Sequence, residues 1–277
     1  LAAVPGTRAL EPGTPLSGYS RQSWVMENGL PQNTVQALAQ TSDGFIWVGT
    51  EVGLVRFDGN SFLIYDQNSK PIALPGNDVQ SLLATPDGGL WIGTTDGLAR
   101  LQKGAIITFT TANGLPDDHV FNVLVDGARI WAATENGLGL YENGKWKAYN
   151  TKDGLAHRAV LSLALDKRTG DIWAGTMGGL SRISGGRIDT FTQLNSGLSN
   201  DVVYGVSVEG EHVWVATAAG ACMLDLRTNQ WSLFNERNTP MFEIWNYAVS
   251  AAEDKVYLAV WGGGVLEYDQ ATERWKD

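Results

Sequence analysis

Cysteine is nearly absent from the 277 residues, because Cys222 is the single thiol. One cysteine excludes a disulfide within the chain and any metal site built from several cysteines. We therefore expect Cys222 to be a buried structural residue. Long apolar runs are missing too, since no stretch of about 18 apolar residues occurs. We predict no direct insertion into a membrane.

Positive charge is also scarce, with 20 Lys and Arg against 30 Asp and Glu and a net charge of −10. A general nucleic-acid binder needs a basic stripe, so we predict no nucleic-acid partner. No nucleophile motif of the type Gly-x-Ser-x-Gly occurs. We predict neither catalytic residues nor a cofactor. The 43% of apolar residues and 18% of charged residues are typical of a globular protein.

The chain contains instead one motif in six copies. The first copy runs from Asp43 to Thr50 as Asp-Gly-Phe-Ile-Trp-Val-Gly-Thr and is followed by Gly53-Leu54. The aromatic residues of successive copies are 44, 40, 42, 41 and 43 residues apart, at Trp47, Trp91, Trp131, Trp173, Trp214 and Tyr257. Periods of about 40–45 residues built of short strands indicate propeller blades. The predicted fold is an all-β propeller of four-stranded antiparallel blades, with six repeats present.

The motif suits a sheet that must pack on both faces. Residues two apart in a strand share a face, so Trp47 and Gly49 point the same way. A large residue beside a small one lets neighbouring sheets interdigitate. The small residue recurs in every copy, at Gly49, Gly93, Ala133, Gly175, Ala216 and Ala259.

Each unit divides into four predicted strands. In the first unit these are residues 35–39, the Trp47 strand, residues 54–58 and residues 62–65. Asp-Gly pairs between apolar runs predict hairpins at Asp43-Gly44, Asp87-Gly88 and Asp126-Gly127. Helix is predicted to be almost absent. Arginines repeat at one position (Arg56, Arg100 and Arg182), which suggests ion pairing between blades.

The two ends of the chain bear on the number of blades. Residues 1–17 are rich in Pro, Gly and Ala and predict an extended lead-in, whereas residues 18–277 form the propeller. Residues 19–24 read as an outer strand, because Trp24 precedes Leu30 by six residues as Phe109 precedes Leu115. None of the six units uses that strand. We therefore predict that it belongs to the seventh blade of a seven-bladed ring, and that the other three strands of this blade lie beyond Asp277. The alternative is a closed six-bladed ring in which the N-terminal strand completes or overlies the last blade. An open array would leave edges that invite another chain, so a dimer or larger assembly is a further expectation.

A second motif, Gly29-Leu30-Pro31-x-Asn33-x-Val35, precedes the first copy and recurs before later ones. The two motifs, this one and Asp-Gly-x-x-Trp-x-Gly-Thr-x-x-Gly-Leu, together resemble the two-component regulator propeller repeats. The resemblance covers nearly the whole chain from Tyr19 onward and is most specific in the first four units. The resemblance implies a periplasmic sensor domain of a bacterial membrane-bound signalling protein, such as a hybrid histidine kinase or a diguanylate cyclase. It also implies carbohydrate fragments as a ligand class. Residues 1–6 are compatible with the end of an export signal or with an artificial start of the sequence; we favour export, to the periplasm or the cell exterior.

Nine of the eleven tryptophans occupy repeated positions, five in the second strand and four in outer strands at Trp24, Trp146, Trp231 and Trp275. The other two are Trp245 and Trp261. We align Trp245 with the first apolar residue of the inner strand, at Val35, Val79, Val120, Val160 and Val202. We align Trp261 with a loop position held elsewhere by Glu51, Thr95, Glu135, Met177 and Ala218. Both positions lie on one face of the disk, so with Glu243, Asn246 and Tyr247 they form a candidate ligand or partner site. Ordinary packing in a diverged unit is the alternative.

Three further residues are candidates on this face: Met177, His119 and His157. Two histidines without a clear third ligand make a weak metal site, so no metal is predicted. Carboxylates on the same face could serve a lyase or glycoside hydrolase, namely Asp78, Asp117, Asp118, Asp201 and Glu243. The sequence favours a non-catalytic propeller that senses a small or oligomeric, carbohydrate-like solute. A protein-interaction scaffold or accessory subunit is the alternative, and an enzyme ranks last.

Overall fold

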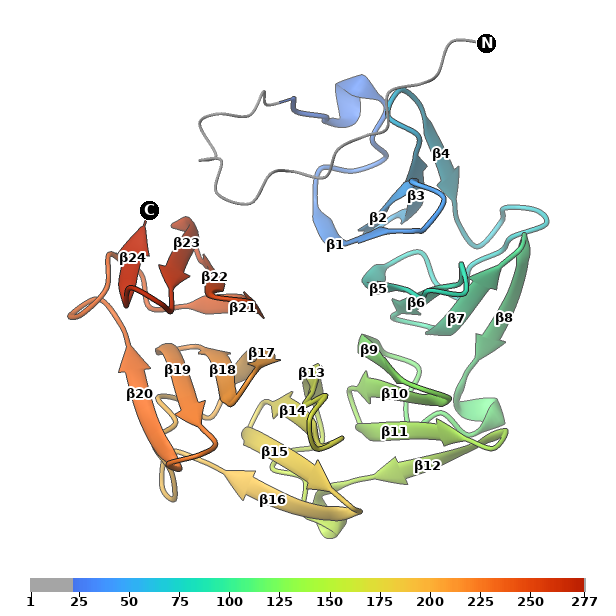
Figure 1. Ribbon diagram of the computed structural model, residues 1–277. Helices are drawn as coiled ribbons and strands as arrows, with labels where there is room; N and C mark the ends of the chain where they lie inside the picture. Colours follow the sequence, from blue (N-terminus) through green and yellow to red (C-terminus); the bar gives the residue numbers. More distant parts are fainter. Residues whose placement is uncertain (1–21, 277) are drawn as a thin grey trace.

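Each copy of the repeat folds into one antiparallel sheet whose four strands follow in sequence order. The computed structural model describes residues 22–276, and its six sheets are arranged around a common axis as the blades of a propeller (Figure 1). The predicted all-β fold and the four-stranded antiparallel blades are confirmed.

The strand boundaries repeat from blade to blade. Blade 1 contains β1 (Val35–Gln40), β2 (Ile46–Thr50), β3 (Gly53–Phe57) and β4 (Phe62–Tyr65). Blade 2 contains β5 (Val79–Ala84), β6 (Leu90–Thr94), β7 (Gly97–Gln102) and β8 (Ala105–Phe109). Blade 3 contains β9 (Val120–Asp126), β10 (Arg129–Thr134), β11 (Gly137–Glu142) and β12 (Lys145–Tyr149). Blade 4 contains β13 (Val160–Leu165), β14 (Ile172–Thr176), β15 (Gly179–Ser184) and β16 (Arg187–Phe191). Blade 5 contains β17 (Val203–Glu209), β18 (His212–Thr217), β19 (Gly220–Asp225) and β20 (Gln230–Phe234). Blade 6 contains β21 (Asn246–Ala252), β22 (Lys255–Val260), β23 (Gly264–Asp269) and β24 (Arg274–Lys276).

Turns and helices agree with the sequence. The predicted hairpins join the first two strands of blades 1, 2 and 3, where Gly44, Gly88 and Gly127 adopt positive φ values of 91°, 76° and 61°. The helices within residues 22–276 are three single-turn 3₁₀ helices, η2 (Met26–Asn28), η3 (Thr111–Asn113) and η4 (Thr151–Asp153). In that same part of the chain, no helix is long and apolar enough to cross a bilayer.

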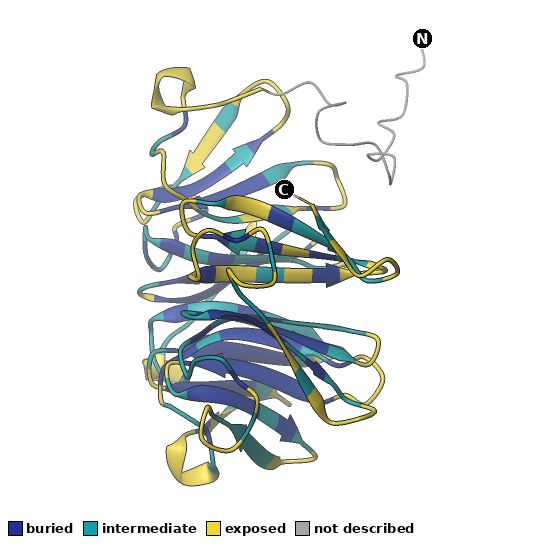
Figure 2. Cartoon of the chain, turned by 90° about the vertical axis from the view of Figure 1, so that its left-hand side faces the viewer, coloured by how far each residue is buried: buried dark blue, intermediate teal, exposed yellow. Residues whose placement is uncertain are grey.

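The core lies in the seams between successive blades. The repeated tryptophan of one blade packs against the next blade, so that Trp173 contacts the cluster containing Val206, Val213 and Leu224 of blade 5. The small residue two positions later lets the neighbouring inner strand approach. A Cβ added at Gly175 would lie 2.7 Å from Val203 Cγ1 and 3.0 Å from its carbonyl oxygen. Buried residues therefore concentrate in the strands, whereas the loops on the two faces of the disk are exposed (Figure 2).

Two smaller sequence expectations have clear outcomes. Cys222 is fully buried, as predicted, and its thiol donates to Ser199 Oγ at 3.1 Å. The prediction of pairing between blades for the repeated arginines is wrong. Arg182 Nη2 pairs with Asp171 Oδ2 of its own blade at 2.5 Å, and Arg100 pairs with Asp87 of its own blade. Each guanidinium also lies over the tryptophan of its own blade, Trp173 or Trp91.

The ring is open between blades 1 and 6 (Figure 1). Tyr257 occupies the tryptophan position of blade 6 but is 39% exposed, and Val265 is 57% exposed where its counterparts in blades 1 to 4 are fully buried leucines. On the opposite side of the opening, Leu38 of β1 is 65% exposed. Among residues 22–276, two sheet faces thus lack a neighbouring blade, and these residues do not close into a six-bladed ring. Residues 22–25 form no strand, and the rest of the predicted outer strand, like the lead-in 1–17, lies outside the described residues.

Candidate functional site

One face of the disk gathers the start of each inner strand and the loop between the second and third strands. A backbone hydrogen bond joins the two in blades 2 to 6. In blade 6 Trp261 N donates to Trp245 O at 2.9 Å, and in blade 4 Met177 N donates to Ala159 O at 3.2 Å. The alignment of Trp261 with Met177 and its counterparts is confirmed.

The alignment of Trp245 with Val35, Val79, Val120 and Val160 is wrong by one residue, whereas its alignment with Val202 is correct. Val79 pairs with Thr94 and Val203 with Thr217, and the residue that pairs with Val260 in blade 6 is Asn246. The counterparts of Trp245 are therefore Asp78, His119, Ala159 and Val202. The error arises because the turn between the first two strands varies in length: Val79 lies 12 residues before Trp91, whereas Asn246 lies 11 residues before Tyr257.

Four aromatic side chains from blades 5 and 6, which we call the aromatic cluster, meet on this face: Tyr204, Trp245, Tyr247 and Trp261. The Tyr247 ring lies 5.4 Å from the Trp261 ring, 6.2 Å from the Trp245 ring and 5.0 Å from the Tyr204 ring. Trp261 is 60% exposed. Burial, and then the neighbouring Tyr247 side chain, raises the pKa of Tyr204 above its ordinary value, so the Tyr204 phenol stays neutral at physiological pH. The structure thus brings together three of the predicted residues and adds Tyr204.

Two exposed apolar residues beside this cluster were missed by the sequence analysis, Phe242 and Ile244. Phe242, 70% exposed, stands where earlier units carry Pro75, Pro116, Ala156 or Ser199. Ile244 stands where units 1, 2, 3 and 5 carry asparagine or aspartate and unit 4 carries Arg158. The sequence did contain a signal for these two residues. Only the sixth unit has a large apolar residue at positions where the other units carry a small or polar one. Glu243, between them, is exposed as expected.

The loop acids proposed as catalytic candidates hold the loops together. Asp118 Oδ1 accepts a hydrogen bond from Thr111 N at 2.6 Å, and Asp201 Oδ1 accepts one from Gln193 N at 2.8 Å. Asn33 and Asn77 accept equivalent bonds in blades 1 and 2. Ile244 has no side-chain acceptor, so blade 6 has replaced this structural contact by an exposed apolar group.

The two histidines have different surroundings. His157 Nδ1 accepts from Ala159 N at 3.1 Å, as Asp117 Oδ1 accepts from His119 N and Asn200 Oδ1 from Val202 N. His157 therefore caps its loop. The ring of His119 instead packs on Phe121 at 4.2 Å, and its Nε2 is buried without a hydrogen-bond partner. In residues 22–276 no three His, Cys, Asp or Glu side chains are grouped as metal ligands.

Asn246 and Met177 complete the predicted set. Asn246 is fully buried, and its Nδ2 donates to Ile244 O at 2.8 Å, so it supports the loop from inside and does not reach the exposed surface. Met177 is exposed on the same face, in blade 4.

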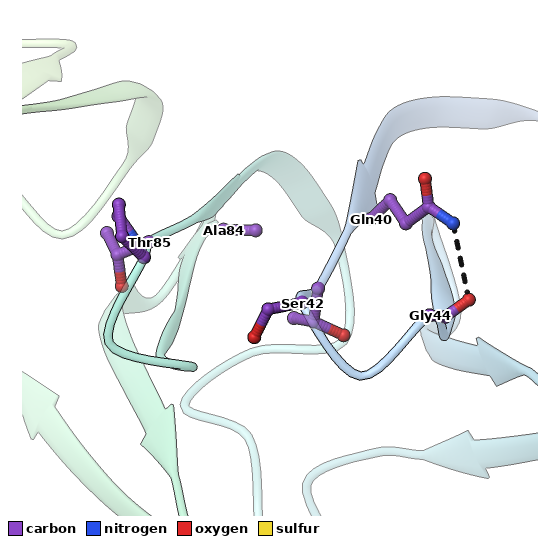
Figure 3. A pocket seen from close by; sticks show the side chains of 7 residues that line it. Gln40, Ser42, Gly44, Ala84 and Thr85 are labelled. Atoms are coloured by element: carbon purple, nitrogen blue, oxygen red, sulfur yellow. Dashed lines mark hydrogen bonds between the residues drawn. The ribbon is translucent and has the colours of Figure 1, made fainter. Parts of the chain in front are cut away.

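Two hollows are associated with the blade seams. An apolar one of about 230 Å³ is lined by Pro240, Met241, Phe242, Val260, Gly263 and Leu266, beside Trp261 in the chain. The other, about 490 Å³, lies between the first-to-second-strand turns of blades 1 and 2 (Figure 3). It opens on the opposite face and is lined by small and polar residues such as Ser42, Ala84 and Thr85. The apolar hollow therefore belongs with the aromatic cluster.

Comparison with known proteins agrees with the repeat. The family model "Two component regulator propeller" matches residues 29–52 and 73–96. No curated protein matches the sequence. The extracellular domain of a putative hybrid two-component system from B. thetaiotaomicron superposes with a TM-score of 0.78 at 20% identity, over 92% of this chain and 36% of that one. The extracellular domain of a putative one-component system from the same organism gives 0.73 at 15% identity, over 90% and 36%.

The propeller fold is shared more widely. Virginiamycin B lyase from Staphylococcus aureus superposes with a TM-score of 0.69 at 15% identity, over 87% of this chain and 83% of the lyase. Identities this low establish the common fold. The chain spans about a third of the two signalling proteins' domains, at 36% of each. The resemblance inferred from the motifs is confirmed, since residues 29–52 and 73–96 match the two-component regulator propeller model.

Proposed function

We propose that the chain is a non-catalytic binding propeller, an extracytoplasmic sensing domain that recognises a small or oligomeric, carbohydrate-like solute on the face of the aromatic cluster. The observation that carries the proposal is that blade 6 replaces the loop contact of blades 1, 2, 3 and 5 by the exposed apolar Ile244, beside the exposed aromatic cluster. Exposed apolar patches of this kind mark interaction sites on soluble proteins. Aromatic faces suit the apolar face of a sugar ring, because they supply rigid contact area at low entropic cost.

The comparison with known proteins supports the proposed location. The structural similarity to extracellular domains of bacterial signalling proteins supports a sensor outside the cytoplasm, and the regulator-type repeat supports a role in signal transduction. The apolar hollow of about 230 Å³ beside Phe242 is smaller than a typical ligand pocket of about 300–1,000 Å³. It would hold a substituent of the solute, while the aromatic cluster holds its ring.

The test is the substitution Trp261→Ala, with Ile107→Ala as the matched control. Both side chains are about equally exposed, at 60% and 59%, but Ile107 lies on the outer strand of blade 2. A thermal-shift panel of neutral and charged oligosaccharides first identifies a binder, and calorimetry then measures its affinity. We expect Trp261→Ala to weaken binding by about 2 kcal/mol, as for an aromatic hot spot, with an unchanged melting temperature. Loss of thermal stability with full affinity would show that Trp261 is a packing residue.

A protein partner is the second candidate function. Phe242, Ile244, Trp245 and Trp261 present mostly apolar surface, and aromatic residues are enriched at the centres of protein interfaces. If no solute binds but a partner protein is captured in a manner that depends on Trp261, the chain is an interaction scaffold.

Catalysis finds less support. Asp117, Asp118 and Asp201 are engaged in loop contacts, and Asp78 accepts from two glutamine side chains. Similarity in fold to a lyase at 15% identity assigns no reaction to this chain.

A further inference from the structure

Every inner strand contains a β-bulge at the same place. The residue after the first position of the strand has no partner on the second strand, so the register shifts there in all six blades. We call these six the bulge residues: Gln36, Gln80, Phe121, Leu161, Tyr204 and Tyr247.

The bulge frees these positions from the packing of the blades. Ordinary strand residues alternate between the two sheet faces and are buried in the seams, as the fully buried neighbours Val79, Val120, Val160 and Val203 are. A bulge re-aims its side chain and interrupts pairing. None of the six bulge residues is buried. They lie on the strands nearest the axis (Figure 1), at the end that carries the aromatic cluster.

Blades 1 and 2 make one side of this array polar. Gln36 Nε2 donates to Asp78 Oδ1 at 2.5 Å, and Gln80 Nε2 donates to the same oxygen at 2.7 Å. Each amide keeps one further N–H, and the oxygens left for a ligand are Gln36 Oε1, Gln80 Oε1 and Asp78 Oδ2. All three are acceptors.

Blades 3 to 6 make the other side apolar. Phe121 packs on His119, Leu161 follows in blade 4, and Tyr204 and Tyr247 lie 5.0 Å apart. Tyr247 continues into the aromatic cluster through Trp261. Aromatic faces attract cations as well as apolar ring faces, and they offer nothing to an anion.

We propose that the six bulge residues select the ligand, and that this ligand is a ring-containing solute with hydrogen-bond donors and no negative charge. Its donors bind the Gln36–Asp78–Gln80 side and its apolar faces bind the tyrosine side. The inference rests on the proposed binding function and adds to it the residues and the charge that set specificity. The net charge of −10 acts in the same direction, since it disfavours anionic ligands.

The experiment compares three tetrasaccharides by calorimetry at low salt: neutral cellotetraose, cationic tetraglucosamine and anionic tetragalacturonate. We expect the neutral or the cationic probe to bind at least about tenfold more tightly than the anionic one. Gln80→Met, which removes an acceptor, should weaken binding of the neutral probe by about three- to tenfold. Asp78→Asn should reduce the preference for the cationic over the anionic probe by about fivefold or more.

The matched control is Gln40→Met on the opposite face, where Gln40 Nε2 donates to Gly44 O; it should change none of these ratios. Thermal melts identify any variant that is merely destabilised. Tighter binding of the anionic probe, no binding of any of the three, or ratios unchanged by Asp78→Asn and Gln80→Met would overturn the inference. If Trp261→Ala abolishes probe binding while Gln80→Met and Asp78→Asn change nothing, the inference is overturned and the proposed function stands. Binding that Trp261→Ala leaves unchanged would contradict the proposed function itself.

Discussion

At the scale of single residues, one position shows how context decides the energetic role of an aromatic side chain. Trp91 in blade 2 is buried and packs against blade 3, whereas Tyr257 occupies the same position in blade 6 and faces the opening. We expect Trp91→Ala to lower the free energy of unfolding by about 3–5 kcal/mol, because it leaves a cavity in a seam. Tyr257→Ala should cost less than about 1 kcal/mol, as exposed substitutions usually do.

Urea denaturation of the two variants measures the difference. Equal losses in both would mean that the Tyr257 face is covered in solution.

The pairing of Asp171 with Arg182 gives the stability a dependence on pH. Burial by itself raises the pKa of Asp171, but hydrogen bonds from Ser184 and Arg182 outweigh it, and the pKa is lowered in the folded protein. A carboxylate with a lowered pKa stabilises the fold above its unfolded pKa of about 3.9 and loses that contribution as pH falls through the folded pKa. Between pH 5 and roughly pH 2, Asp171→Asn should therefore lose less stability than the parent chain. Urea midpoints across this range measure it, and parallel curves would contradict the prediction.

At the scale of elements, a buried threonine fixes the loop between the second and third strands in five blades. Thr176 Oγ1 donates to Gly179 O at 2.7 Å, and the other four make the same contact at 2.7–2.9 Å. In blade 6 the position is Val260, and the following loop carries Trp261. The sixth loop is thus released from the shape that the other five share.

Thr176→Val should cost about 1–3 kcal/mol, because the buried Gly179 carbonyl loses its donor. Thr176→Ser, which keeps the hydroxyl, is the control and should cost less. Binding at blade 6 should be the same in both variants, and a change in affinity would show that the loops of blades 4 and 6 are coupled.

Elements were predictable from the sequence because they depend on repeated residues, and the site was predictable only where it departs from the repeat. The spacing of Trp47, Trp91 and their counterparts is sufficient to place the strands to within about one residue. The bulge broke that logic, since an extra unpaired residue leaves no mark in a pattern of alternation. For that reason Tyr204 was overlooked, whereas Trp245 was misaligned because the turn between the first two strands varies in length from blade to blade. The loop contact of Asp118 was not predictable, because a loop-capping acid and a catalytic acid are the same residue type.

At the scale of the whole molecule, residues 24–30 are arranged as a connection from a preceding blade. The 3₁₀ turn η2 and the positive φ of Gly29, 102°, repeat η3 with Gly114 at 100° and η4 with Gly154 at 110°. The Trp24 ring contacts Phe57 of blade 1 at 5.0 Å. Phe109 on the outer strand of blade 2 contacts Tyr141 of blade 3 in the same way, at 5.2 Å. Trp24 therefore stands where the outer-strand aromatic residue of a preceding blade would stand.

A seventh wedge between blades 6 and 1 would cover the two unpartnered faces, and its effect can be measured. Appending a copy of residues 66–102, the connection and first three strands of blade 2, after Asp277 should raise the melting temperature, because the exposed parts of Leu38, Tyr257 and Val265 would become buried, each contributing less than the roughly 1.5–3 kcal/mol of a fully exposed side chain. The same extension on a chain carrying Leu38→Glu and Val265→Glu should give no increase, since each glutamate would lie unpaired in the new seam. An equal increase in both chains would contradict a packed seventh wedge. A stable dimer of the unextended chain, found by light scattering, with Tyr257 shielded from solvent would also contradict it. A second copy would then occupy the opening.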